Sequence, residues 1–217
     1  MAIKRDIQGR KPAEDRKREI VSTALKLADK VGPDRLSAAM IARNVEISQP
    51  AVFKHFSSMN ALWLAVAAHI ETAMKKKWEA AFSAEKDERE QLRDLVLAQL
   101  RFIQTVPAVP GILFSRELHA GNKGLRQAFL KIMSALHNRI TNIIASGQES
   151  GVFSRDVPAV DSAYLVLGFI QGLAVRWSVS GKNFPLVDEG ERLFAIQMRF
   201  LMEEPSSGGK GDEHEQT

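Results

Sequence analysis

Signals for three helices in quick succession occupy residues 20–56, and they constrain the fold more than any other feature of the chain. Apolar residues first recur at one-turn spacing, as on one face of an amphipathic helix, at Ile20, Ala24, Leu27, Ala28 and Val31. Gly32 and Pro33 follow directly, a C-cap glycine and then a residue that cannot continue a helix. We therefore expect the first helix to end at Val31.

Two serines mark the starts of two shorter helices. Ser37 is a good N-cap for a helix over residues 38–44, and Ser48 is a good N-cap for a helix with Pro50 in its first turn. The third helix has an apolar inner side made of Val52, Phe53 and Phe56, and we interpret the two phenylalanines as core residues. The segment thus predicts three short helices that close on one small core.

The second and third helices have the outline of a helix-turn-helix, whose second helix enters the major groove of DNA by its N-terminal end. Charge points to the same partner, because residues 1–60 hold 12 Lys or Arg against 7 Asp or Glu, a net charge of +5. Residues 61–217 hold 18 against 19 and have a net charge of −1. The excess positive charge therefore lies wholly in the N-terminal module, which favours a nucleic-acid partner.

The rest of the chain keeps helical spacing and shows no strand alternation. The expected helices cover about 58–77, 92–106, 112–119, 125–144, 158–180 and 189–202. We expect Gly147 and Gly151 to stop the helix over 125–144. The sequence therefore predicts an all-α fold, with an N-terminal three-helix domain that contains the helix-turn-helix and a larger C-terminal helical domain.

Residues 163–175 are apolar nearly all round, which indicates a helix buried on more than one side. This run is shorter than the 20 or so residues that cross a bilayer, and Gln171 interrupts it, so no membrane partner is expected. Gly168 and Gly172 are four residues apart and allow another helix to approach closely. We interpret the segment as a core helix that also meets a second subunit.

No feature of an enzyme is present. The chain lacks cysteine, which excludes disulfides and thiolate zinc sites, and it contains no HExxH, phosphate loop, GxSxG or paired Glu-x-x-His motif. We expect no catalytic residues, metal or cofactor, and a cytoplasmic protein because residues 1–12 lack an apolar signal segment. Two alternatives to a DNA-binding protein stay open, an all-helical enzyme and a protein-interaction module that does not bind DNA.

The residues of the helix-turn-helix resemble the TetR family of transcriptional regulators. The resemblance covers about residues 14–70 and is carried by Ile41-Ala42, by Ile47-Ser48-Gln49-Pro50-Ala51-Val52-Phe53-Lys54-His55-Phe56 and by Ala61-Leu62. It implies a supporting helix over 38–44 and a recognition helix over 49–55. It also implies a repressor that a small-molecule effector releases from a pseudo-palindromic double-stranded DNA operator, and a homodimer formed through the last two long helices (about 158–180 and 189–202).

The residues expected to contact DNA are Ser37, Arg43, Ser48, Gln49, Pro50, Ala51, Phe53, Lys54 and His55. Gln49 can pair with an adenine edge, and Pro50 and Ala51 offer apolar contact to thymine methyl groups. Lys54 and His55 can reach phosphates. The free N–H groups at the capped helix starts can also hold phosphate.

Three positions depart from the family pattern. Phe53 replaces the usual tyrosine, Met59 replaces the usual lysine, and Glu46 stands where the turn normally holds glycine. The first two changes remove phosphate contacts, and the third leads us to expect either a strained turn or a different path. Weaker DNA binding is expected, which the basic residues of the arm and those at 16–18 could offset.

The larger domain is expected to hold the effector among apolar and aromatic side chains, with a few polar groups to orient it. The candidate pocket residues are Phe102, Phe114, His119, Phe129, Met133, His137, Phe169 and Gln171. The expected organisation is a basic flexible arm (1–13), a DNA-binding domain (14–58), an effector-binding and dimerisation domain (59–202) and a disordered tail (203–217).

Overall fold

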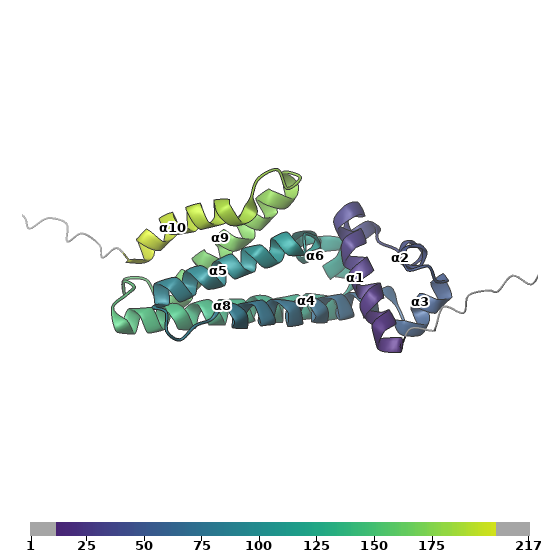
Figure 1. The fold of residues 1–217 in the computed structure, drawn as a ribbon, viewed down its shortest axis with the longest axis horizontal. Helices are drawn as coiled ribbons and strands as arrows, with labels where there is room; N and C mark the ends of the chain where they lie inside the picture. The colour runs from purple at the N-terminus through teal and green to yellow at the C-terminus, as the bar shows by residue number, and fades with distance from the viewer. Residues whose placement is uncertain (1–11, 203–217) are drawn as a thin grey trace, which may run out of the picture. The chain divides into compact units, whose positions relative to one another are not determined.

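The computed structural model describes residues 12–202, which form helices joined by short connections (Figure 1). The elements are α1 (Ala13–Val31), the 3-10 helix η1 (Pro33–Arg35), α2 (Ala38–Asn44), α3 (Gln49–His55), α4 (Met59–Ala81), α5 (Glu88–Thr105), α6 (Ala108–Phe114), α7 (Arg116–Gly121), α8 (Lys123–Ser150), α9 (Ala159–Val179) and α10 (Leu186–Met202). No strand occurs between residues 12 and 202, and the predicted all-α fold class is confirmed. The expected tail, and the expected arm up to residue 11, lie outside the described residues.

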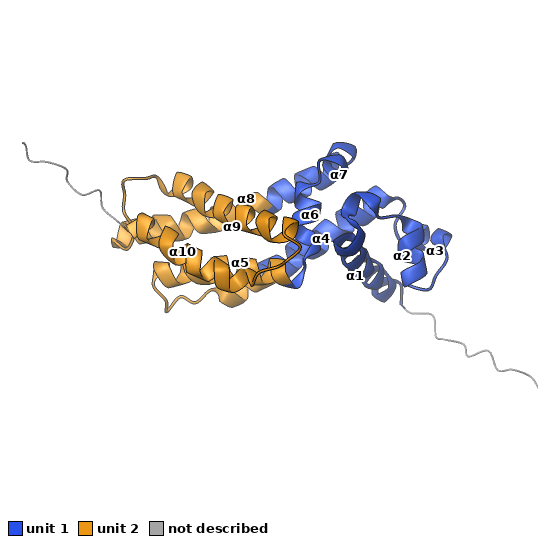
Figure 2. Ribbon diagram, turned by 90° about the horizontal axis from the view of Figure 1, so that it is seen from above, with its two compact units in different colours: residues 1–75, 105–132 blue, residues 76–104, 133–217 orange. Residues whose placement is uncertain are grey.

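The chain divides into two compact units (Figure 2). The first unit is made of residues 1–75 and 105–132, and the second of residues 76–104 and 133–217. The first unit therefore contains the expected DNA-binding domain together with two further segments, 59–75 and 105–132. The expected boundary at residue 58 stays a prediction.

The first helix ends, and the second and third helices begin, at the residues that their caps predict. Gly32 adopts a φ of 86° and its N–H donates to the Ala28 carbonyl at 3.0 Å, which ends α1 at Val31. Ile20 of α1, Ile41 of α2 and Val52 of α3 are almost completely buried, so the three helices share one apolar core. Burial of such side chains stabilises a small domain by about 1.5–3 kcal/mol each.

Residues 108–121 form two short helices where the sequence predicted one over 112–119. Ser115 separates α6 from α7, and its Oγ accepts a hydrogen bond from the Leu118 N–H at 3.0 Å, which caps α7. The same hydroxyl donates to the Asp34 carboxylate in η1. Pro110 lies inside α6 near its start, where a missing N–H costs nothing, so it does not end the segment.

The second unit has its own apolar core, to which α5, α8, α9 and α10 each contribute buried side chains, for example Leu100, Ile140, Val166 and Phe194. Gly190 of α10 allows a close approach there, because a Cβ at this position would lie 2.2 Å from Leu100 Cδ1.

The prediction that Gly147 stops α8 is wrong. The helix continues to Ser150 and ends before Gly151, which adopts a φ of 83°. Gly147 is required for a different reason, because a Cβ there would lie 2.2 Å from Cδ2 of the buried Phe153 ring. The glycine makes room for the phenylalanine that follows the helix.

Among the described residues, α9 is the one single helix whose length and composition would allow it to cross a membrane. Its buried side chains, including Ile170 and Trp177, belong to the core of the second unit, as is typical of a central helix in a helical domain. The feature is therefore weak evidence for a membrane span.

Candidate nucleic-acid interface

Both helices of the helix-turn-helix begin at a serine cap. The Ser37 Oγ accepts from the Met40 N–H and the Ser48 Oγ accepts from the Ala51 N–H, each at 3.3 Å. Pro50 lies in the first turn of α3, where it has no N–H to leave unsatisfied. The predicted caps are confirmed, and they fix the residues at which α2 and α3 begin.

One face of α3, which we call the α3 outer face, carries Gln49, Pro50, Phe53 and Lys54. These four residues line an open hollow on the surface of the first unit. Gln49 and Lys54 differ in what they offer, since the amide can both donate and accept hydrogen bonds while the ammonium only donates. A surface that combines an amide, a cation and two apolar groups can read the edge of a base and also hold a phosphate.

The interpretation of Phe53 as a core residue is wrong. Val52 is 1% exposed and Phe56 is 8% exposed, whereas Phe53 is 38% exposed. Residues 52 and 56 are four positions apart and share the inner side of α3, while one step along a helix turns a side chain by about 100°. The Phe53 ring therefore belongs to the outer face, where the family's usual tyrosine would present a hydroxyl.

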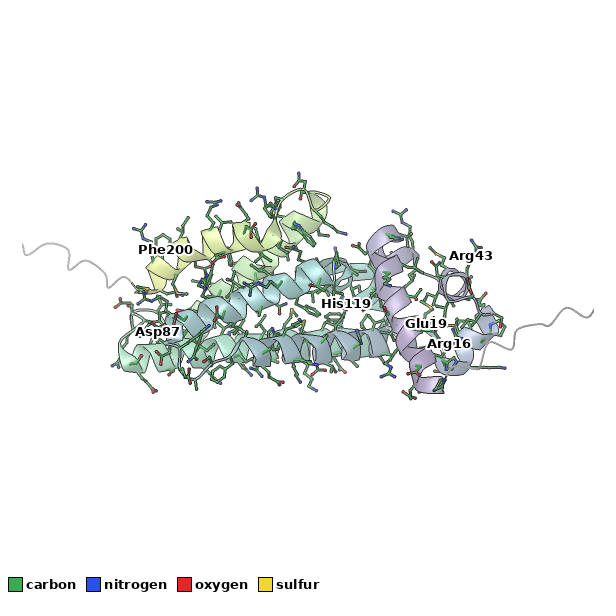
Figure 3. All side chains as sticks on the ribbon, in the orientation of Figure 1. Arg16, Glu19, Arg43, Asp87, His119 and Phe200 are labelled. Atoms are coloured by element: carbon green, nitrogen blue, oxygen red, sulfur yellow. The ribbon has the colours of Figure 1, made fainter. Side chains whose placement is uncertain are left out.

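The other expected DNA contacts lie at the surface to different degrees. Ser37, Arg43 and Ser48 are exposed, whereas Ala51 and His55 are half-buried. Arg43 is in the last turn of α2, where a cation interacts favourably with the helix dipole (Figure 3). The structure thus leaves Arg43 accessible from solvent, and its role in DNA binding stays a prediction.

The turn between α2 and α3 is left-handed at Glu46, where the sequence has no glycine. Glu46 adopts a φ of 56°, a conformation that costs a residue other than glycine about 1–2 kcal/mol. The Ile47 N–H donates to the Ala42 carbonyl at 3.0 Å and closes the turn. Of the two expected alternatives, a strained turn or a different path, the structure has the strained turn.

Arg16 of α1 supports this turn from outside it. Its Nη1 lies 2.8 Å from Oε2 of Glu19 and donates to the Val45 carbonyl at 3.4 Å (Figure 3). The side chain is only 22% exposed, so much of its charge is engaged within the domain. Spacing along the sequence gave no sign of this contact, because Arg16 and Val45 are 29 residues apart.

The neighbouring cations of α1 are paired on the surface. Lys17 Nζ lies 3.0 Å from Glu14 Oε1, and Arg18 is paired with Asp15. Exposed pairs of this kind are worth about 0–1 kcal/mol, so phosphates can compete for these cations.

A second surface feature is an apolar face on α9 and α10, which we call the α9/α10 apolar face. It is defined by side chains that are between 44% and 82% exposed: Val160, Tyr164, Leu165, Val179, Ile196 and Phe200. Phe200, labelled on α10 in Figure 3, is 71% exposed. Gly168 and Gly172 are also exposed, and nothing lies within 4 Å of where their Cβ atoms would be.

The expected effector residues fall in both units. Phe114, His119 and Phe129 belong to the first, and Phe102, Met133, His137, Phe169 and Gln171 belong to the second.

Some of these residues meet inside a unit. The His119 ring meets the Phe129 ring edge-on at 5.6 Å between centroids, and Gln171 Nε2 lies 3.4 Å from Met133 Sδ. Nε2 of His137 lies 3.1 Å from the Val160 carbonyl oxygen. These are packing contacts, and a role in ligand binding stays a prediction.

Two family models match consecutive segments of the chain. The model described as "Bacterial regulatory proteins, tetR family" matches residues 20–66, and the model described as "YsiA-like protein, C-terminal region" matches residues 68–199. A curated relative, the nucleoid occlusion factor SlmA of Vibrio vulnificus, is 22% identical over 188 residues, which are 87% of this chain and 96% of the relative.

Solved structures show the same fold. The fatty acid degradation regulator FadR from Bacillus halodurans has a TM-score of 0.73 at 12% identity, covering 88% of this chain and 97% of its own. The transcriptional regulator FadR from Bacillus subtilis, solved in complex with stearoyl-CoA, has a TM-score of 0.71 at 13% identity, covering 83% and 97%. At these identities the likeness concerns the fold alone.

Proposed function

The chain belongs to the tetR family of bacterial regulatory proteins, and from that premise we propose that it is a repressor released from its operator by a small-molecule effector. It is a DNA-binding transcriptional regulator, and its family is one of regulators rather than enzymes. The α3 outer face is the observation that best supports DNA contact, because it presents an amide, a cation and two apolar groups at a serine-capped helix start. We place this protein in the cytoplasm, where its DNA is.

The first test measures DNA binding by fluorescence anisotropy, with the DNA that flanks the protein's own gene, with unrelated DNA, and at two salt concentrations. Tight, salt-sensitive binding that prefers the flanking DNA is expected, since contacts to several phosphates make affinity fall steeply with salt. Absence of binding at low salt would overturn the proposal and favour the protein-interaction alternative.

Variants separate base contacts from phosphate contacts. Gln49→Ala should weaken binding to the preferred DNA by about 1–3 kcal/mol and leave unrelated DNA unaffected. Lys54→Gln should weaken binding to both DNAs and reduce the salt slope by about one. Lys123→Gln removes the same charge from an exposed position on α8 and serves as the matched control. Equal losses in all three variants would contradict the assigned contacts.

We propose that two copies of the chain pair through the α9/α10 apolar face. Its exposed side chains and its two open glycines support this, because a second helix can approach there and bury apolar surface. Leu165→Ser combined with Phe200→Ser should lower the mass measured by light scattering from about twice the 24.1 kDa of one chain towards a single chain. Leu130→Ser, at a leucine of the first unit that is 51% exposed, should leave the dimer intact.

The effector is proposed to act by binding better to a form whose two recognition helices are wrongly spaced for successive major grooves. The stearoyl-CoA bound to Bacillus subtilis FadR supports a mainly apolar molecule. Within the first unit, the Ser115–Asp34 hydrogen bond connects the α6–α7 junction to η1, directly after α1. We keep residues 14–58 as the DNA-binding domain and 59–202 as the effector and dimerisation domain.

A further inference from the structure

A cavity of about 160 Å³ opens on the second unit. It lies between the end of α4, the start of α5 and the middle of α8, and we call it the α4–α5–α8 cavity. Its lining includes Trp78, Phe82, Gln91, Arg139, Asn142 and Ile143.

One wall of the cavity is flat and fixed. The Trp78 side chain is only 2% exposed, and its indole N–H donates to the buried Gln99 Oε1 at 2.8 Å. A satisfied, buried hydrogen bond holds the plane of the ring and leaves it no polar group to turn towards solvent. The rim differs, because Phe82 is 56% exposed and more than half of it stays open to solvent. A flat apolar molecule in the cavity would cover the exposed part of the Phe82 ring and touch the small part of Trp78 that the fold leaves accessible.

The charge at the cavity is positive and only weakly neutralised. The Arg139 guanidinium lies 5.7 Å from the centre of the Trp78 ring, and within residues 12–202 it pairs with one carboxylate, that of Glu79, at 4.0 Å. The Glu79 side chain is 67% exposed, so water screens this pair and a second carboxylate can compete for the guanidinium.

Two amides complete the lining. Gln91 Nε2 donates to the Lys86 carbonyl at 2.7 Å, which leaves the amide oxygen as an acceptor, and Asn142 is exposed on α8. We infer that the α4–α5–α8 cavity binds a small planar aromatic acid, with its ring against Trp78 and Phe82 and its carboxylate at Arg139. A cavity of about 160 Å³ suits a ligand with a single ring.

The test uses isothermal titration of the full chain, without DNA, against benzoate and its neutral isostere benzamide. Because no DNA is present, the result is independent of the proposed DNA binding. Arg139→Gln should weaken benzoate binding about five- to tenfold and leave benzamide unchanged, since only the anion gains a charge-assisted hydrogen bond. Arg126→Gln removes the same charge from another exposed position of α8 and should change neither.

A second variant makes a prediction of opposite sign. Glu79→Gln removes the competing carboxylate and should tighten benzoate binding about two- to fivefold without affecting benzamide. A merely structural Arg139–Glu79 pair would not produce that gain. Phe82→Ser, at an exposed position, should weaken both ligands. The inference is overturned if benzoate does not bind at millimolar concentration, or if Arg139→Gln and Arg126→Gln bind it equally.

Discussion

The strained turn of the helix-turn-helix yields a prediction with two separable readouts. Glu46 holds a φ of 56°, and its side chain makes no hydrogen bond or ion pair with any other residue between 12 and 202. Glu46→Gly removes the steric cost of the left-handed conformation and also removes a carboxylate from the turn that precedes the recognition helix. The substitution should therefore both stabilise the protein and strengthen its binding to DNA.

The expected stabilisation is a difference between two effects. Relief of the left-handed conformation is worth about 1–2 kcal/mol, and the greater freedom of glycine in the unfolded chain costs about 0.4–1 kcal/mol. The net gain lies between about 0 and 1.6 kcal/mol, and its middle value of about 0.8 kcal/mol raises the Tm of a chain of this size by about 2–3 °C. Loss of one like charge near the phosphates should raise affinity about two- to fivefold.

Two control variants isolate the two effects, with Tm followed by circular dichroism and affinity by anisotropy. Glu46→Gln removes the charge but keeps the backbone constraint, so it should raise affinity and leave Tm unchanged. Lys182→Gly relieves the other left-handed residue that is not a glycine within residues 12–202, with a φ of 64°, and should raise Tm without changing affinity. Its gain should be smaller, because Lys182 also lies 5.9 Å from the Trp177 ring centre. A Tm for Glu46→Gly below that of the wild type would refute the reasoning.

Three further predictions concern stability. Gly147→Ala should lower the free energy of unfolding by about 1–3 kcal/mol through overpacking against Phe153, whereas a purely helix-breaking glycine would make the alanine variant more stable; urea unfolding decides between the signs. Ser115→Ala should cost about 1 kcal/mol by the same assay because it removes a cap and the bond to Asp34, and Asp34→Asn, which keeps an acceptor, should cost less. The Glu88 carboxylate accepts hydrogen bonds from its own N–H and from Ser146, and these bonds lower its pKa below the ordinary value of 4.5. The stability that Glu88 contributes is therefore present above pH 4.5 and is lost as pH falls through the folded-state pKa. Glu88→Gln should therefore be less stable than wild type at pH 7 and equally stable in acid, and a deficit independent of pH would contradict this.

Caps made of neighbouring residues could be predicted from the sequence. Ser37 and Ser48 each bond to an N–H three residues later, and Gly32 bonds back within its own helix. Such contacts join residues that are three or four positions apart, so the sequence of neighbouring residues is enough to predict them. The bounds of α2 and α3 followed correctly for this reason.

Contacts between distant residues could not be predicted in the same way. Phe53 adjoins an apolar position on a helix of seven residues, and only the packing of the whole domain decides which side of so short a helix is buried. A glycine is typical of a helix end, but the role of Gly147 depends on where the Phe153 ring lies. The contact between Arg16 and Val45, and the grouping of Trp78 with Arg139, likewise need the folded chain.

The first compact unit is discontinuous, and this has a consequence for synthesis on the ribosome. Its two pieces, 1–75 and 105–132, are separated by a segment that belongs to the other unit. The Asn60 carbonyl that accepts from Asn122 Nδ2, and Asp34 that accepts from Ser115, are therefore made long before their partners. At about 5–20 residues per second, the 57 residues from 75 to 132 take roughly 3–11 s to translate. For those seconds the nascent three-helix domain must keep its structure with only its own small core.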